Sequence, residues 1–141
     1  MTLMKDRKRY QQGMRIRRAV LGDEHVDRAV ATTTDFNRDF QNFITCNAWG
    51  DVWARPGLPR RTRSLITLAL MVALNRVEEF RMYVKAALNN GVTRDQIKEV
   101  LLHSAIYCGI PAANSAFRMA SEVFKKVDGK TKTNSKKKKQ S

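Results

Sequence analysis

Hydrophobic residues recur at helical spacing along almost the whole chain, and no stretch alternates apolar and polar positions for long enough to predict a strand. Turn and cap residues divide this pattern into segments, with Gly22 after the first and Asn90–Gly91 after the fifth. Pro59 suits the first turn of the fourth segment, and Thr93 with Gln96 forms a capping box for the sixth. The pattern predicts an all-α fold of six to seven helices, over residues 4–21, 23–30, 35–44, 59–74, 76–89, 93–107 and 111–127.

Two of these segments carry more hydrophobic surface than a solvent-facing helix needs. The third, capped by Thr34 or Asp35, has one continuous apolar face, which predicts that this face lies in the core. The fourth, residues 59–74, is apolar nearly all round and must be covered on every side. We therefore expect a homo-oligomer, because bundles of this length often bury more surface between subunits. The apolar face of the third segment consists of Phe36, Phe40, Phe43 and Ile44.

The net charge of +14 is concentrated toward the C-terminus. Residues 125–141 carry eight lysines and one Asp, which is half of the net charge, and almost nothing that a core could bury. This composition predicts a single folded domain over residues 1–124, followed by a Lys-rich disordered tail. A second basic cluster lies in the first helix, at Lys5, Arg7, Lys8, Arg9, Arg15, Arg17 and Arg18.

Several classes of protein are disfavoured by what the sequence lacks. Cys46 and Cys108 lie far apart, without a CxxC motif or a Cys/His cluster, so we expect no metal site and no disulfide framework. That usage fits a cytoplasmic protein. The longest apolar run, residues 65–74, is about half as long as a membrane-spanning helix. No zinc-finger, RRM or KH pattern predicts specific binding of nucleic acid.

Charged residues interrupt an apolar helical pattern within residues 70–91, LMVALNRVEEFRMYVKAALNNG. Arg76, Glu79 and Tyr83 fall at i, i+3 and i+7, so a continuous helix would project all three from one face. Two interpretations fit this spacing. Arg76 and Glu79 either form a solvated ion pair in a break between two core helices, or they line a polar pocket.

Four stretches, which together span roughly residues 8–124, carry a resemblance to a known family. They are GMRIRRAVLGDEHVDRA, FQNFITCNAWGDVWARPG, RPGLPRRTRSLITLALMVALNR and RMYVKAALNNGVTRDQIKEVLLHSAIYCGIPAAN. Together they resemble the γ-carboxymuconolactone decarboxylases of aromatic-acid catabolism. The resemblance implies an alkylhydroperoxidase-D-like helical bundle and a homo-oligomer, typically a hexameric ring. It also implies decarboxylation of 4-carboxymuconolactone to 3-oxoadipate enol-lactone in the β-ketoadipate pathway.

The resemblance implies roles for particular residues. The substrate is a lactone dicarboxylate whose own ring accepts the electron pair, so no cofactor and no metal are expected. A buried acid must return a proton to carbon, and Glu79 is expected to do so, with Tyr83 orienting it or the lactone and Arg76 stabilising charge. Guanidinium groups suit carboxylates because they offer paired hydrogen bonds. The expected substrate-binding residues are Arg60, Arg63, Arg81 and Tyr107.

The chain departs from the family pattern at three histidine positions, where it has Arg61, Tyr83 and Ser115. No cysteine stands at Arg76 or Glu79, which excludes the dithiol peroxidase chemistry of the alkylhydroperoxidase-D-like proteins, since that route needs a thiolate. Two other functions stay open. The replaced histidines favour a catalytically weakened member that binds a small organic acid, and the basic first helix favours a module that binds a polyanion.

Overall fold

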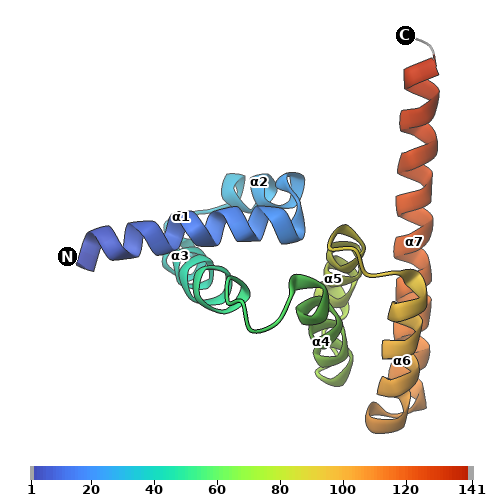
Figure 1. The fold of residues 1–141 in the computed structure, drawn as a ribbon. Helices are drawn as coiled ribbons and strands as arrows, with labels where there is room; N and C mark the ends of the chain where they lie inside the picture. The colour runs from blue at the N-terminus through green and yellow to red at the C-terminus, as the bar shows by residue number, and fades with distance from the viewer. Residues whose placement is uncertain (1, 140–141) are drawn as a thin grey trace. The chain divides into compact units, whose positions relative to one another are not determined.

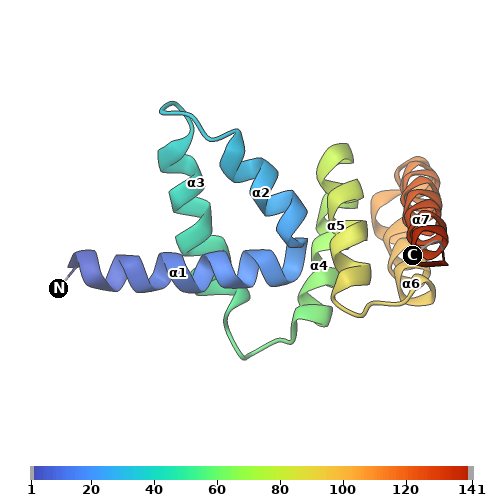
Figure 2. The ribbon, with the colours of Figure 1, turned by 90° about the horizontal axis from the view of Figure 1, so that it is seen from above.

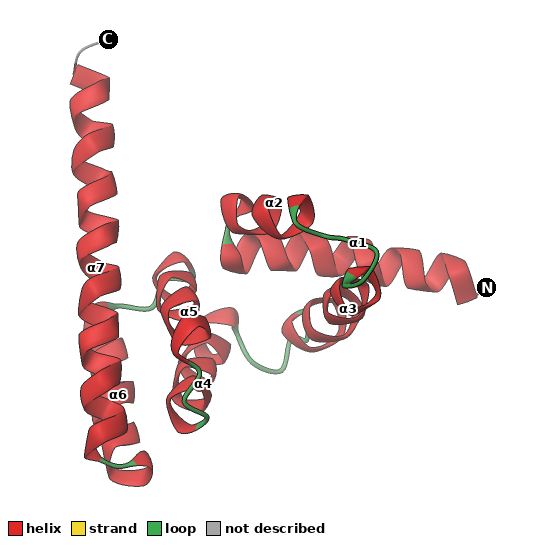
Figure 3. Ribbon diagram, turned by 180° about the vertical axis from the view of Figure 1, so that it is seen from behind, coloured by secondary structure: helices red, strands yellow, loops and turns green. Residues whose placement is uncertain are grey.

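A computed structural model describes residues 2–139, and all regular structure within them is helical: seven α-helices and one π-helix, joined by short loops (Figure 3). The all-α prediction is therefore confirmed for these residues. None of the described helices is both long and apolar enough to span a bilayer. The chain divides into two compact units, Met1–Arg63 and Ser64–Ser141. The single domain expected over residues 1–124 stays a prediction.

The N-terminal unit consists of α1 (Thr2–Leu21), α2 (Asp23–Ala31), α3 (Arg38–Ile44) and the π-helix η1 (Thr45–Trp53). Helices α2 and α3 extend to the same side of α1, and a loop joins their far ends (Figure 2). α1 packs chiefly against η1. Trp49 of η1 is buried, and its ring lies 5.2 Å from that of Trp53.

Two glycines let α1 and η1 approach closely. A Cβ atom added to Gly13 would lie 1.9 Å from the carbonyl oxygen of Thr45, and one added to Gly50 would lie 2.7 Å from that of Arg9. Both neighbours are backbone atoms in helices, which cannot rotate away as a side chain would. Arg9 also bridges the crossing, because its Nη2 donates to Asp51 Oδ2 at 2.5 Å. The packing of this unit therefore depends on the absence of side chains at positions 13 and 50.

The C-terminal unit contains most of α4 (Arg60–Ala73), followed by α5 (Val77–Asn89), α6 (Arg94–Cys108) and α7 (Ile110–Lys139). α7 packs against both α5 and α6, and α6 runs beside the first half of α7 (Figure 1). All four helices contribute to one hydrophobic core. Its buried members include Leu68, Phe80, Val84, Ile97, Leu101, Ala116, Met119 and Val123.

Local sequence signals located several helix ends. The predicted capping box is confirmed, since the Thr93 hydroxyl accepts from the Gln96 N–H at 3.1 Å and the Thr93 N–H donates to Gln96 Oε1 at 3.0 Å. Asn90 is the C-cap of α5. At the start of α2 the N-cap is Gly22.

The prediction that the aromatic face of the third helix lies in the core is wrong for this chain. α3 begins only at Arg38, and Phe36, Phe40 and Phe43 are 98%, 61% and 62% exposed. α1 packs instead chiefly against the π-helix that follows α3, in which Trp49 is buried. The aromatic face of α3 is left in water.

α4 is covered on one side only. Leu68 and Val72 are buried in the core, whereas Ile66, Leu70 and Leu74 are 45%, 51% and 61% exposed. A helix that is apolar nearly all round thus keeps half of its surface uncovered in the single chain.

The Lys-rich segment is helical in the structure, where the sequence predicted disorder. α7 continues without interruption through Lys139. Val127 still packs against the core, and the Asp128 carboxylate pairs with Arg94 Nη2 at 2.6 Å, whereas residues 129–139 are exposed. Lysine is a good helix former, so helix propensity rather than burial sustains this end. A domain limit at residue 124 stays a prediction, because α7 crosses it.

Replacing Gly13 with Ala should destabilise the N-terminal unit by about 1–3 kcal/mol or more, because the new methyl group would collide with backbone. Gly129→Ala is the matched control: its Cβ would meet no atom within 4 Å, and Ala in a helix is favoured over Gly by about 0.5–1 kcal/mol. Urea unfolding followed by circular dichroism measures both variants. Equal midpoints for Gly13→Ala and the parent would contradict the close crossing.

Candidate active site

The turn between α4 and α5 is built around Asn75. Its φ of 54° lies in the left-handed region, which asparagine tolerates better than most residues. The Asn75 N–H donates to the Val72 carbonyl at 3.2 Å, and the Arg76 N–H donates to the Met71 carbonyl at 2.9 Å. These bonds satisfy carbonyl groups that the end of a helix would otherwise leave open. The turn sets Arg76 as the N-cap of α5.

Two adjoining hollows lie beside this turn. The smaller has a volume of about 20 Å³ and is lined by Arg76 and by apolar side chains of α4, α5 and α7, such as Phe80. The larger is an open groove of about 580 Å³ at the end of α4, the end of α6 and the start of α7. Four of the residues along the groove also line the smaller hollow. The groove is lined by Val72, Ala73, Asn75, Tyr107, Cys108, Pro111, Ala112 and Ser115.

Arg76 lies outside the helix in which the sequence placed it. α5 begins at Val77, and the Arg76 backbone is not helical, with φ −95° and ψ 86°. The predicted alignment of Arg76 with Glu79 and Tyr83 on one helical face is therefore wrong for Arg76. The residue is exposed, and it lines the smaller hollow, whereas Glu79 lines neither hollow.

Glu79 is exposed in the first turn of α5 in the single chain, whereas the sequence predicted a buried acid. Glu78 stands in the same turn, and carboxylates there interact favourably with the positive end of the helix dipole. Tyr83, one turn further, is half-buried and packs against the core. Glu79 and Tyr83 keep a shared helical face, and their catalytic roles stay predictions.

Arg81 is engaged by α7. Its Nη1 forms a short ion pair with Glu122 Oε2, and both side chains are partly exposed. The hydrogen bond from Arg81 holds the pKa of Glu122 below its usual value, and the charges of Arg118 and Lys126 act in the same direction. The pair ties α5 to α7, so a substrate carboxylate at Arg81 would compete with Glu122.

Tyr107 is 78% exposed at the end of α6, where it lines the open groove. Its ring lies 5.0 Å from that of His103, one turn earlier. Ser115, which stands at one of the family's histidine positions, lines the same groove from α7. Of the residues predicted for the site, the structure therefore brings Tyr107 and Arg76 to neighbouring hollows.

The two arginines predicted at the start of α4 belong to the N-terminal unit. Arg60 is the exposed first residue of the helix. Arg63 is half-buried, and its Nη2 donates to the Arg55 carbonyl at 3.3 Å. Their roles in substrate binding stay predictions.

Sequence reasoning missed Asn75, which lines both hollows. A signal was present, because asparagine after the last residue of an apolar helix often takes the left-handed conformation that ends it. Within residues 2–139, no group of three or more His, Cys, Asp and Glu side chains is arranged to hold a metal ion.

Comparison with known proteins gives consistent matches. The model of the carboxymuconolactone decarboxylase family matches residues 38–122. The chain is 56% identical to a 4-carboxymuconolactone decarboxylase of Acinetobacter baylyi, over 86% of this chain and 91% of that protein. It is 44% identical to a nitrosuccinic acid decarboxylase of Metarhizium robertsii, over 78% of this chain and 77% of that protein. A 4-carboxymuconolactone decarboxylase of Pseudomonas putida is 54% identical over 34% of this chain and 100% of its own sequence.

Replacing Glu122 with Gln should lower the melting temperature near neutral pH and have a smaller effect in acid. Because the pKa of Glu122 is lowered in the folded protein, the ion pair contributes stability above the ordinary carboxyl value of 4.5 and loses it as the pH falls through the lower folded value. Thermal unfolding of parent and variant across this range measures the difference. Glu78→Gln, an exposed carboxylate on the same unit, is the control. A difference that stays constant with pH would contradict the role of the pair.

Proposed function

We propose that this chain, which belongs to the carboxymuconolactone decarboxylase family, decarboxylates 4-carboxymuconolactone to 3-oxoadipate enol-lactone. The observation that carries the proposal is the 56% identity to the Acinetobacter relative, which extends over 86% of this chain. The enzyme is then a carboxy-lyase of the β-ketoadipate pathway. The cytoplasmic location predicted from its cysteines stays a prediction.

The chemistry sets three tasks for the protein. The bond between the ring carbon and its carboxylate breaks, CO2 leaves, and the electron pair moves through the ring alkene onto the lactone oxygen. One proton then adds to the carbon beside the lactone carbonyl. The enzyme must hold a dianion, stabilise negative charge on the lactone oxygen and deliver that proton.

Arg76 is well placed to hold a substrate carboxylate. The residue lines the hollow that adjoins the groove, and it precedes the first turn of α5, whose N–H groups and partial positive charge favour anions. Tyr107 and Ser115 line the groove and offer hydroxyl donors for the lactone oxygen. Within the C-terminal unit the remaining candidate for the second carboxylate is Arg81, and the roles of Arg60 and Arg63 stay predictions.

We assign the return of the proton to Glu79, one turn before Tyr83 on α5. Glu79 is exposed in the single chain, whereas a general acid is usually shielded from water. Its role therefore requires that a partner surface removes water from the start of α5. Leu74 and Val77, which flank Arg76 in the chain, are 61% and 44% exposed. A partner surface that covers these two side chains would also remove water from the start of α5.

A second subunit is the partner that we propose for this surface, in a homo-oligomer that the family resemblance suggests is a hexamer. The apolar face of α4 supports this, because it is too large to remain in water without cost. Exposed apolar side chains of α6 and α7 add to the uncovered apolar surface of the C-terminal unit. These exposed residues are Ile66, Leu70, Leu74, Leu102, Ile106 and Ile110.

Light scattering of the full-length protein at micromolar concentration should give the mass of about six chains. Leu70→Glu should shift the protein to smaller species, because the change would bury an unpaired carboxylate in an apolar contact. Lys98→Glu is the control, since Lys98 is exposed and already beside an acid in the chain. A monomeric parent would contradict the proposed assembly.

Glu79→Gln and Arg76→Ala should each lower kcat/KM by at least about 100-fold, since each removes a general acid or a charge-stabilising group. Both residues are exposed in the chain, so melting temperatures should change little. The assay follows loss of 4-carboxymuconolactone and appearance of the enol-lactone. Glu78→Gln, in the same turn of α5, is the matched control and should keep the parental rate.

Parental rates in both variants would show that the charged segment is only a solvated break between two helices. In the same assay Tyr83→His restores the family residue: a rate at or above the parent's marks Tyr83 as a degraded position, and a lower rate marks a site rebuilt around the phenol. Turnover of nitrosuccinate but not of the lactone would replace the proposed substrate with that of the Metarhizium relative.

A further inference from the structure

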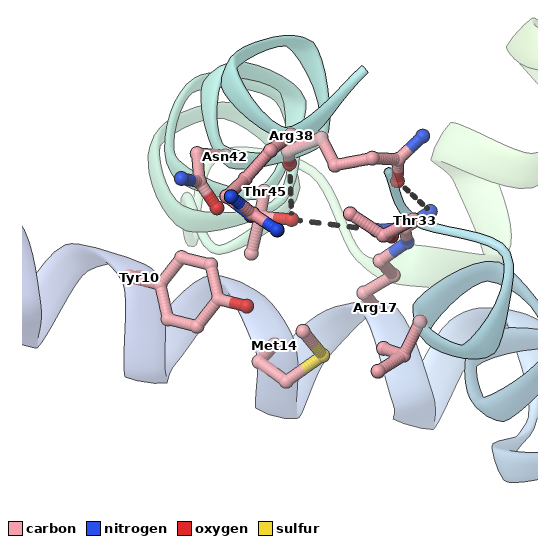
Figure 4. A pocket seen from close by; sticks show the side chains of 9 residues that line it. Tyr10, Met14, Arg17, Thr33, Arg38, Asn42 and Thr45 are labelled. Atoms are coloured by element: carbon pink, nitrogen blue, oxygen red, sulfur yellow. Dashed lines mark hydrogen bonds between the residues drawn. The ribbon is translucent and has the colours of Figure 1, made fainter. Parts of the chain in front are cut away.

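The N-terminal unit encloses a cavity of about 340 Å³, which the proposed decarboxylation does not use. Side chains from α1 and from α3 face one another across it (Figure 4). The volume lies in the range of pockets that hold small organic ligands. None of its lining residues is among those assigned to the decarboxylation. They are Tyr10, Met14, Arg17, Val30, Thr33, Arg38, Gln41, Asn42 and Thr45.

A buried cation forms one wall of this cavity. Arg17 is only 6% exposed, although arginine is rarely buried in proteins. Its Nη1 donates to Thr45 Oγ1 at 3.3 Å and its Nη2 to Gln41 Oε1 at 3.1 Å, and the Thr45 hydroxyl donates in turn to the Gln41 carbonyl at 2.7 Å (Figure 4). These bonds fix the guanidinium against the cavity, so its position does not depend on a ligand.

A second cation adds to the positive potential. Arg38 lines the cavity from the start of α3, and none of the lining residues is acidic. Its Nη1 pairs with Asp35 at 2.7 Å, but both side chains are largely exposed, so water screens this pair. A guanidinium has five N–H donors in a planar fork. The cavity therefore presents two guanidinium groups and the amide of Asn42 toward a guest that accepts hydrogen bonds.

The remaining wall is apolar. Tyr10 and Met14 from α1 lie on the side that faces α3 (Figure 4), and Val30 from α2 also lines the cavity. The Tyr10 hydroxyl points into the space between α1 and α3 (Figure 4). An inorganic anion would leave this wall in contact with water, whereas a flat apolar body would cover it.

We propose that this cavity is a binding site for a small organic acid, in which a carboxylate meets the Arg17 and Arg38 side and an apolar body rests on Tyr10, Met14 and Val30. The planar carboxylate suits a guanidinium fork because two parallel hydrogen bonds can form. The site rests on the geometry of the N-terminal unit and is independent of the catalytic assignment.

Isothermal titration of the full-length protein with benzoate tests the site. Benzoate should bind with a dissociation constant of about 1 mM or tighter, and benzamide, which has the same shape without the charge, should bind at least about tenfold more weakly. Arg38→Gln should weaken benzoate at least about tenfold. Arg28→Gln, an exposed arginine of α2 that does not line the cavity, should leave the affinity unchanged.

Further variants separate this site from the others. Arg17→Lys keeps a buried cation but loses the planar fork, so it should also weaken the binding of benzoate. Circular dichroism checks that this variant is folded. If it is not, Tyr10→Phe takes its place in the titration. Arg76→Ala should bind benzoate like the parent. Three results would each overturn the proposal. The first is that Arg76→Ala loses affinity for benzoate while Arg38→Gln keeps it. The others are saturation by phosphate but not by benzoate, and the absence of any saturable heat.

Discussion

Burial of apolar surface is the constraint on which the rest of this structure depends, and one chain satisfies only part of it. The C-terminal unit buries a core around Leu68, Phe80 and Leu101, but the other side of α4 faces water. Covering one large aliphatic or aromatic side chain contributes about 1.5–3 kcal/mol. A few such contacts on α4 would offset the translational and rotational entropy that subunits lose when they associate. This uncovered side of α4 is the surface that we propose a second subunit covers.

The proposed role of the charged segment at the start of α5 depends on the same burial of surface. Within one chain, Glu78 and Glu79 behave as solvated carboxylates beside the positive end of a helix, and Arg76 serves as its N-cap. These local roles explain why charges can follow an apolar helix at all. Catalysis requires more of these side chains, because charged groups that water screens neither hold a dianion firmly nor act as general acids. In this proposal the turn binds substrate only when water is excluded from it. The exposed side chains of Leu74 and Val77 are those on which a covering subunit would pack.

Sequence reasoning succeeded where the cause of a structure is local. The Thr93 capping box, the end of α5 at Asn90 and the limits of α4 each depend on neighbours within one turn. It failed where partners are distant. Nothing near Phe40 in the sequence says that α1 would pack on the π-helix beyond α3. Arg17 looked like one member of a basic surface, yet it is buried, because Thr45 and Gln41 approach it from another helix.

Because the family's histidines are replaced in this chain, fewer residues can return the proton in the proposed decarboxylation. An imidazole can give and take protons near neutral pH, whereas a phenol or an alcohol is a hydrogen-bond donor and a poor proton carrier. Tyr83 and Ser115 can therefore donate a hydrogen bond to a growing negative charge, as can the guanidinium of Arg61. We therefore assign the return of the proton to Glu79, as a general acid shielded from water. In this proposal a subunit that covers the start of α5 has two effects. It buries the exposed apolar side chains there, and it removes water from Glu79, as a general acid requires.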